Sequence, residues 1–462
     1  MLTLFLLAVA TVVLYRAYYF TPETDIPVGS TNKSTPQQIA SVLNTHSVAT
    51  HLSEAIRFPT VSYEQHANDD PADFTAFIRW LAHTYPLVHK QLSLQYINNY
   101  TLLYKWQGQQ SESAVLLSAH YDVVPVNPHT ESDWTHPPFS GAIANGYIWG
   151  RGALDNKSAA IALMEATTVL LKTGFHPQQD IYIALTHDQE TGSQEGAQAI
   201  TEKLQSDAVN LLWSLDEGSF VLDAMTPGNT PSIASTNIAE KGDLALELVA
   251  QSQGRHSTMP QEKAVNILAA AIVKLKEKPA PGGLIGLSED LYIKLDKHMD
   301  FGQRVLFANS WLFKPFVDSS MDSLSSDNLK LRTTAKVNVR LHPQSNVASL
   351  INRVRRTIDD DRIGLQAIAP SEASLVSSTT SLGFAQSARQ TRLALGDVIV
   401  MPAQTIAATD SRFYSQITDT YRFSPMVINQ QDLAGFHGVN ERISIDNMAR
   451  AVTFYAGLMQ TQ

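Results

Sequence analysis

Three apolar runs, each followed by ionisable residues, constrain the fold of this chain most. They cover Val115–Ala119, Ile181–Thr186 and Leu211–Leu215. Short, continuous apolar runs of this kind are typical of strands buried in a parallel sheet. Because the carboxyl ends of parallel strands meet at one edge of an α/β sheet, the residues that follow the runs are expected to gather in one site. The sequence therefore predicts an α/β fold with its functional groups at that edge.

The first run stops at a histidine, His120, and Asp122 follows two residues later. Residues two apart on a strand share a face, so the imidazole and the carboxylate can touch. A carboxylate at one ring nitrogen is typical of a histidine that binds metal through the other nitrogen. The pair therefore predicts a metal ligand, His120, that is oriented by Asp122.

Carboxylates follow the other two runs as well. Asp155 lies in the Gly-rich turn GRGALDNK, which opens a helix expected over Ser158–Lys172. The second and third runs are followed by Asp188, Gln189 and Glu190 and by Asp216 and Glu217. One histidine with several carboxylates suits zinc, cobalt or manganese. Each acid alone has an alternative role as a turn residue or helix cap, but their combination predicts a metal centre.

A series of segments resembles the M20 metallopeptidase family, in the order found there. They read HYDVVP, WTHPPFSG, GRGALDNK, THDQETGSQEGAQ, SLDEGS, GRHSTMP, TDSRFY and GFHGVNERIS. The chain is most similar to the branch that holds carboxypeptidase S and the secreted N-acyl amino acid synthase/hydrolases, and the resemblance runs from Ala49 to the C-terminus. It implies a di-metal aminopeptidase-like α/β catalytic domain with an inserted α+β lid, or dimerisation, domain.

The resemblance also implies a set of ligands for two divalent ions, with Zn²⁺ favoured and Co²⁺ or Mn²⁺ as alternatives. Asp155 would bridge the ions, His120 and Asp216 would complete one site, and Glu190 and His437 would complete the other. Asp216 is chosen over its neighbour because the family's ligand aligns with the first acidic residue of the DEG triplet.

One position departs from the family pattern. The family's general base is the first glutamate of a DEE triplet, and here the triplet reads Asp188-Gln189-Glu190. An amide has no basic lone pair near neutral pH, so Gln189 cannot accept a proton from the attacking water. Asp188 is a weak substitute, because adjacent residues of a strand point to opposite faces. We expect hydrolysis to be weakened, by up to about 10²–10⁴ in rate.

Other residues are candidates for contacts with a substrate. His256 aligns with the family's lid histidine, which polarises the scissile carbonyl, often across a dimer interface; its alternative role is that of a turn residue. Arg340 and Arg412 are candidates for a bidentate grip on a substrate carboxylate. The alternative for both is an ordinary surface arginine.

The expected activity is metal-dependent hydrolysis of an amide bond next to a free carboxylate, in a short peptide or an N-acyl amino acid. The alternative is a catalytically silent homologue that keeps the metals and binds a ligand or partner. A homodimer formed through the lid domain is expected from the resemblance.

The pattern of elements predicts a split catalytic domain. A strand over Leu244–Ala250, an amphipathic helix over Gln261–Lys276 and a strand over Thr334–Leu341 match the inserted domain. The expected ranges are 1–20 for an N-terminal apolar segment, 21–45 for a linker, 46–240 and 371–462 for the catalytic domain, and 241–370 for the lid.

The composition narrows the choice of partners and location. The net charge is −10 without a block of Lys or Arg, which argues against nucleic acid as a partner. Leu2–Tyr15 is apolar, and we expect an uncleaved membrane anchor there, with a cleaved signal peptide or a buried helix as alternatives. The catalytic domain is then expected to be extracytoplasmic, either anchored by the N-terminus or secreted.

Overall fold

The computed structural model of this chain describes most, but not all, of its residues. They are 2–20, 39, 41–63, 70–222, 232–250, 264–278, 345–396, 398–405 and 407–462, with shorter pieces between 301 and 341. Residues 21–38 and 40 of the predicted linker (21–45) lie outside the described residues, as does His256. The chain divides into a larger unit of residues 25–238 and 376–462 and a smaller unit of residues 1–24 and 239–375.

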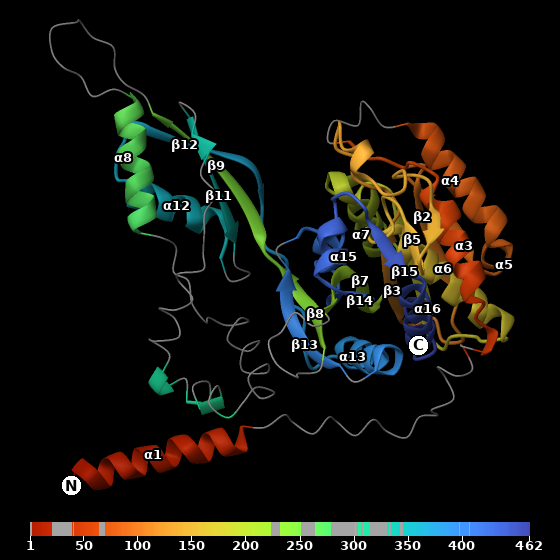
Figure 1. Ribbon diagram of the computed structural model, residues 1–462, viewed down its shortest axis with the longest axis horizontal. Helices are drawn as coiled ribbons and strands as arrows, with labels where there is room; N and C mark the ends of the chain where they lie inside the picture. The colour runs from red at the N-terminus through yellow and green to blue at the C-terminus, as the bar shows by residue number, and fades with distance from the viewer. Residues whose placement is uncertain are drawn as a thin grey trace, which may run out of the picture. The chain divides into compact units, whose positions relative to one another are not determined.

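The larger unit is built on a mixed eight-stranded sheet (Figure 1). Its strands in spatial order are β1 (Ser93–Ile97), β2 (Thr101–Trp106), β6 (Asp180–Thr186), β3 (Ala114–His120), β7 (Leu211–Leu222), β14 (Thr420–Ile428), β8 (Ile233–Glu240) and β13 (Ile399–Thr405). A small sheet beside it consists of β15 (Arg442–Ser444), β5 (Tyr147–Trp149) and β4 (Ala142–Ala144).

The three predicted apolar runs form neighbouring strands at the centre of the large sheet. β3 pairs in parallel with β6 on one side and with β7 on the other, and β7 pairs in parallel with β14. Every residue of β3 and β6 is buried, as expected for strands covered on both faces. The prediction of parallel strands is confirmed, but β7 continues to Leu222 and does not end at Leu215.

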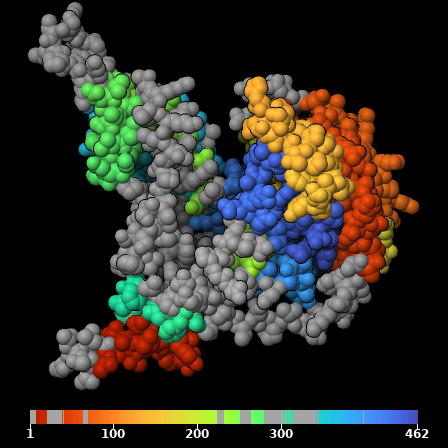
Figure 2. All heavy atoms as spheres, in the orientation of Figure 1, coloured from red at the N-terminus to blue at the C-terminus, as the bar shows by residue number. Residues whose placement is uncertain are grey.

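Helices cover this sheet. They are α3 (Thr45–Ile56), α4 (Pro71–Thr84), α5 (Pro86–Gln91), α6 (Lys157–Lys172), α7 (Ala199–Ser206), α13 (Leu382–Leu395), α14 (Ser411–Tyr414), α15 (Gln430–Gly435) and α16 (Ile445–Met459). On α7, Ile200 and Leu204 share a buried cluster with Leu116 of β3 and Ala184 of β6. Helix α16 contacts α6, α3 and β14, so N-terminal and C-terminal segments adjoin in this unit (Figure 2).

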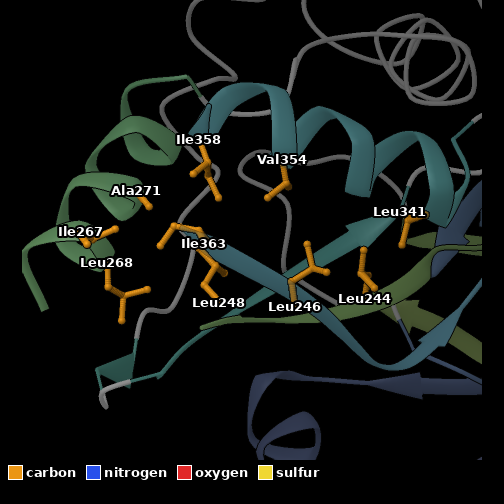
Figure 3. Close-up of a cluster of buried hydrophobic side chains, with 10 residues drawn as sticks. All are labelled: Leu244, Leu246, Leu248, Ile267, Leu268, Ala271, Leu341, Val354, Ile358 and Ile363. Carbon is orange, nitrogen blue, oxygen red and sulfur yellow. The ribbon is translucent and has the colours of Figure 1, made fainter. Parts of the chain in front are cut away.

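The smaller unit contains a four-stranded antiparallel sheet with two helices. The strands in spatial order are β10 (Lys330–Leu331), β11 (Thr334–Leu341), β9 (Gly242–Ala250) and β12 (Ile363–Ser371), and the helices are α8 (Ala264–Glu277) and α12 (Val347–Ile358). Leu244, Leu246 and Leu248 alternate on one face of β9 and point into a core that α8 and α12 complete (Figure 3). The part of this unit that spans residues 239–375 is therefore an α+β domain inserted into the chain of the larger unit.

The N-terminal apolar segment forms helix α1 (Leu2–Tyr19). Within the part of the chain that the structure describes, no helix combines the length and the apolar character needed to cross a membrane. The N-terminal anchor therefore stays a prediction.

Candidate metal centre

His120, the last residue of β3, is held between two sets of carboxylates. Its Nδ1 lies 3.2 Å from Oδ1 of Asp122, which confirms the predicted contact, although Asp122 lies two residues beyond the end of β3. Its Nε2 lies 3.0 Å from Oδ1 of Asp155. His120 and Asp122 are 1% and 0% exposed, so the imidazole is fixed in orientation by a fully buried partner.

Asp155 lies between two histidines that are far apart in the sequence. Its Oδ1 faces Nε2 of His120 at 3.0 Å, and its Oδ2 faces Nε2 of His437 at 2.7 Å. One carboxylate with an imidazole at each oxygen has the arrangement expected of a bridging ligand. The structure thus brings His437 to the end of β3, as the family resemblance implied.

Glu190 completes this cluster. A ligand atom from each of His120, Asp155 and Glu190 lies within 4.8 Å of the others. The backbone N–H groups of Gln189 and Glu190 donate to the two oxygens of Asp122, at 3.2 and 3.1 Å, which fixes this turn beside His120. Oε1 of Glu190 is buried and accepts no hydrogen bond in the structure, although such groups are nearly always paired. An uncompensated buried oxygen among imidazoles and carboxylates fits a divalent cation.

Glu217, and not Asp216, lies at the other side of His120. Oε1 of Glu217 is 3.3 Å from Nε2 of His120, and its Oε2 accepts a hydrogen bond of 3.0 Å from Nδ2 of Asn156. Oδ2 of Asp216 instead accepts hydrogen bonds from the backbone N–H and the hydroxyl of Ser411, at 3.0 and 2.8 Å. The choice of Asp216 as a ligand is therefore corrected to Glu217.

An irregularity in β7 explains this correction. Against β14, Asp216 pairs with Arg422 but Ser219 pairs with Phe423, so Glu217 and Gly218 are extra residues in β7. A bulge changes the direction of the side chains it contains and is common beside active sites. The available sequence signal was Gly218 within an apolar run that continues past the acidic pair, because an internal strand glycine often marks a bulge.

Burial and mutual repulsion shift the pKa values of the acids in this cluster. Burial, reinforced by the charge of Asp155, raises the pKa of Glu190 to about 7 and that of Glu217 to about 8, against the opposing effect of nearby imidazoles. Hydrogen bonds to Asp155 and Glu190 raise the pKa of His437 to about 10. A divalent cation would supply the positive charge that protons otherwise supply here.

The position of the predicted base is filled by an anchored amide. Nε2 of Gln189 donates to the carbonyl of Ala408 at 3.0 Å. Asp188 is 3% exposed, and its Oδ2 accepts from the N–H of Glu195 at 2.7 Å. Asp188 is thus engaged with the following loop, which does not favour it as a substitute base.

The remaining candidates are placed only in part. Arg412 lies half-buried on α14, next to Ser411, which holds Asp216. Arg340 lies on β11 of the smaller unit, opposite Asp243 of β9. The roles of both arginines stay predictions.

Known proteins resemble this chain over most of its length. The model of Peptidase family M20/M25/M40 matches residues 116–461. Probable carboxypeptidase S-like 2 of Dictyostelium discoideum is 35% identical over 441 residues, 89% of this chain and 84% of that protein. N-fatty-acyl-amino acid synthase/hydrolase PM20D1 of Xenopus tropicalis is 35% identical over 436 residues, 88% of this chain and 84% of that protein.

Among solved structures, human carnosine dipeptidase 1 matches with a TM-score of 0.64 at 14% identity, over 93% of this chain and 99% of that one. This similarity concerns the fold alone, and it confirms the predicted α/β catalytic domain with an inserted α+β domain. The matched family model and the two relatives establish the membership that the sequence segments implied. The chain belongs to Peptidase family M20/M25/M40 and is of the metal-dependent hydrolase class.

Proposed function

We propose that this protein hydrolyses the amide bond of N-acyl amino acids or short peptides beside a free carboxylate, using two divalent metal ions. The observation that carries the proposal is the placement of His120 and His437 at opposite oxygens of the buried Asp155 carboxylate, 3.0 and 2.7 Å away. Neighbouring ions that share one carboxylate are typical of two-metal hydrolases.

The chain supplies a ligand set for each ion. His120, Asp155 and Glu217 would hold one, and Asp155, Glu190 and His437 would hold the other. Zn²⁺ fits best, with Co²⁺ or Mn²⁺ as alternatives, because the donors are imidazole nitrogens and carboxylate oxygens. When bound, such ions polarise a carbonyl and lower the pKa of water. Asp122 keeps the His120 ring oriented toward the cluster.

The type of substrate is inferred from the relatives and from the arginines. The names of the two relatives describe a carboxypeptidase S-like protein and an N-fatty-acyl-amino acid synthase/hydrolase. Both descriptions fit an amide next to a carboxylate. We assign the carboxylate end to Arg340 or Arg412, and the scissile carbonyl to His256, as in the family.

A second candidate function rests on Gln189. Because its amide cannot accept a proton and is anchored on Ala408, the site can bind metals without fast hydrolysis. The protein would then be a metal-binding homologue that recognises a ligand of the same type. We also propose that the protein assembles as a dimer through the smaller unit. It would be located outside the cytoplasm, held by an N-terminal anchor.

A matched pair of substrates tests the activity. Metal-loaded protein should hydrolyse an N-acyl amino acid with a free carboxylate and should act at least about tenfold more slowly on the same compound as its carboxamide, since a charge-assisted contact contributes about 1.5–3 kcal/mol. Release of the free α-amino group, as the amino acid from one compound and as the amino acid amide from the other, is the measurement. Equal rates on both compounds would contradict recognition of the carboxylate, and binding without any release would favour the silent homologue.

A further inference from the structure

A buried ion pair that the proposed chemistry does not use lies next to the metal cluster. Arg151 is 2% exposed and Glu441 is 0% exposed, and Nη1 of the arginine lies 2.6 Å from Oε2 of the glutamate. The small sheet brings the two together, because β5 ends just before Gly150 and pairs with β15. The N–H of Gly150 also donates to the carbonyl of Glu441 at 2.9 Å.

The glutamate binds the turn that presents Asp155. Oε1 of Glu441 accepts the backbone N–H groups of Gly152, Leu154 and Asp155, at 3.1, 2.7 and 3.1 Å. Three donors that converge on one charged oxygen define the conformation of this turn, since charge-assisted hydrogen bonds are the strong ones. The position of the Asp155 carboxylate therefore depends on Glu441.

The arginine binds the loop that presents His437. Nη2 of Arg151 donates to the carbonyls of His437 and Gly438, at 3.3 and 3.1 Å. The His437 side chain is 49% exposed, its ring stacks on that of Phe436, and its φ of +54° is a backbone conformation that needs support from its surroundings. The backbone contacts from Arg151 supply a support for it.

We propose that Arg151 and Glu441 form a clamp that sets the spacing between the Asp155 carboxylate and the His437 imidazole. In this role they are positioning residues of the metal centre, and the inference rests on the proposed metal centre. Buried ion pairs contribute little to stability compared with apolar residues of the same shape, so a geometric role accounts for this one better than a stabilising role. The clamp joins segments that are distant in the sequence.

Glu441 acts on both ions, whereas Arg151 acts on one of them. Asp155 belongs to both ligand sets, whereas His437 belongs to one. Arg151→Met removes the support of the His437 loop and leaves the three N–H donors on Glu441. It should therefore weaken the binding of the one ion that His437 holds. In Glu441→Gln the side-chain NH₂ group faces either the guanidinium of Arg151 or the three backbone N–H groups, and it repels the group that it faces. The variant should therefore bind both ions more weakly.

The test is a titration of metal-free protein with Co²⁺, followed by calorimetry and by the visible spectrum of the bound ion. We expect the parent to bind two ions, Arg151→Met to bind one of them about 10–100-fold more weakly, and Glu441→Gln to bind both more weakly by a similar factor. Glu165→Gln is the matched control. Glu165 is also buried, at 7% exposure, and it pairs with His51 and Tyr85, which are not part of the cluster.

A double variant separates positioning from stability. Arg151→Met with Glu441→Gln leaves no uncompensated buried charge, so its resistance to denaturant should recover toward that of the parent. Its His437-side ion should stay weakly bound, with an altered Co²⁺ spectrum. If the parent binds two ions and the affinities recover together with stability, or if the single variants bind like the parent, the clamp is refuted. A parent that binds no metal would refute the metal centre itself and the clamp with it.

Discussion

Replacement of Gln189 by glutamate is expected to raise kcat by about 10² or more. A glutamate has nearly the shape of the glutamine and adds a carboxylate that can accept a proton from the attacking water. The present amide donates to the carbonyl of Ala408. A carboxylate cannot make that contact and is repelled by the carbonyl oxygen, so it is free to turn toward the cluster. Turnover of an N-acyl amino acid by metal-loaded parent and variant is the measurement.

Gln194→Glu is the matched control for this comparison. Gln194 is exposed on the same segment, so the substitution adds the same charge without adding a group at the base position. It should leave kcat unchanged. A parent that already turns over as fast as Gln189→Glu would show that another group accepts the proton, and the account of Gln189 would be wrong. If neither protein hydrolyses substrate while both bind metal, the silent homologue is favoured.

Replacement of Glu217 by glutamine is expected to remove one of the two ions and to lower kcat/KM by about 10²–10³. The expectation follows because a bound ion contributes several kcal/mol of transition-state stabilisation, and each 1.36 kcal/mol corresponds to a factor of ten. Oε1 of Glu217 is the group that faces Nε2 of His120 at 3.3 Å. The bound metal per chain after dialysis is the primary measurement, and rates can be compared in the Gln189→Glu background.

The variant Asp216→Asn, at the neighbouring acid, shows which of the two acids binds metal. Oδ2 of Asp216 accepts two hydrogen bonds from Ser411, so this variant is expected to keep both ions. Retention of two ions by Glu217→Gln together with loss of one ion by Asp216→Asn would restore the original choice of ligand and contradict the geometry of the bulge.

The parts of the site that follow from local periodicity could be predicted from the sequence. His120 and Asp122, two residues apart, were expected to touch, and their side chains lie 3.2 Å apart, although β3 ends at His120. The strand expected over Leu244–Ala250 is present as β9 (Gly242–Ala250), and its Leu244, Leu246 and Leu248 point into the core of the smaller unit (Figure 3). These features depend on residues that lie close together in the sequence.

The remaining parts depend on contacts that no local pattern encodes. His437 meets Asp155 across 282 positions of the chain, and only the family resemblance anticipated that contact. Glu217 replaced Asp216 because two extra residues in β7 shift its register against β14, and simple alternation cannot foresee a bulge. The Arg151–Glu441 pair carried no signal beyond two charged residues near ligand-bearing segments.

The most direct test of the central claim is the rate of amide hydrolysis as a function of bound metal. Protein freed of metal with a chelator is titrated with Zn²⁺ or Co²⁺, and both bound ions and released amino acid are measured, with the Gln189→Glu variant as the more active form. Metal-free protein is expected to show no hydrolysis, and the rate is expected to rise until two ions are bound per chain. Hydrolysis that persists in metal-free protein, or saturation of binding at a single ion, would contradict this expectation.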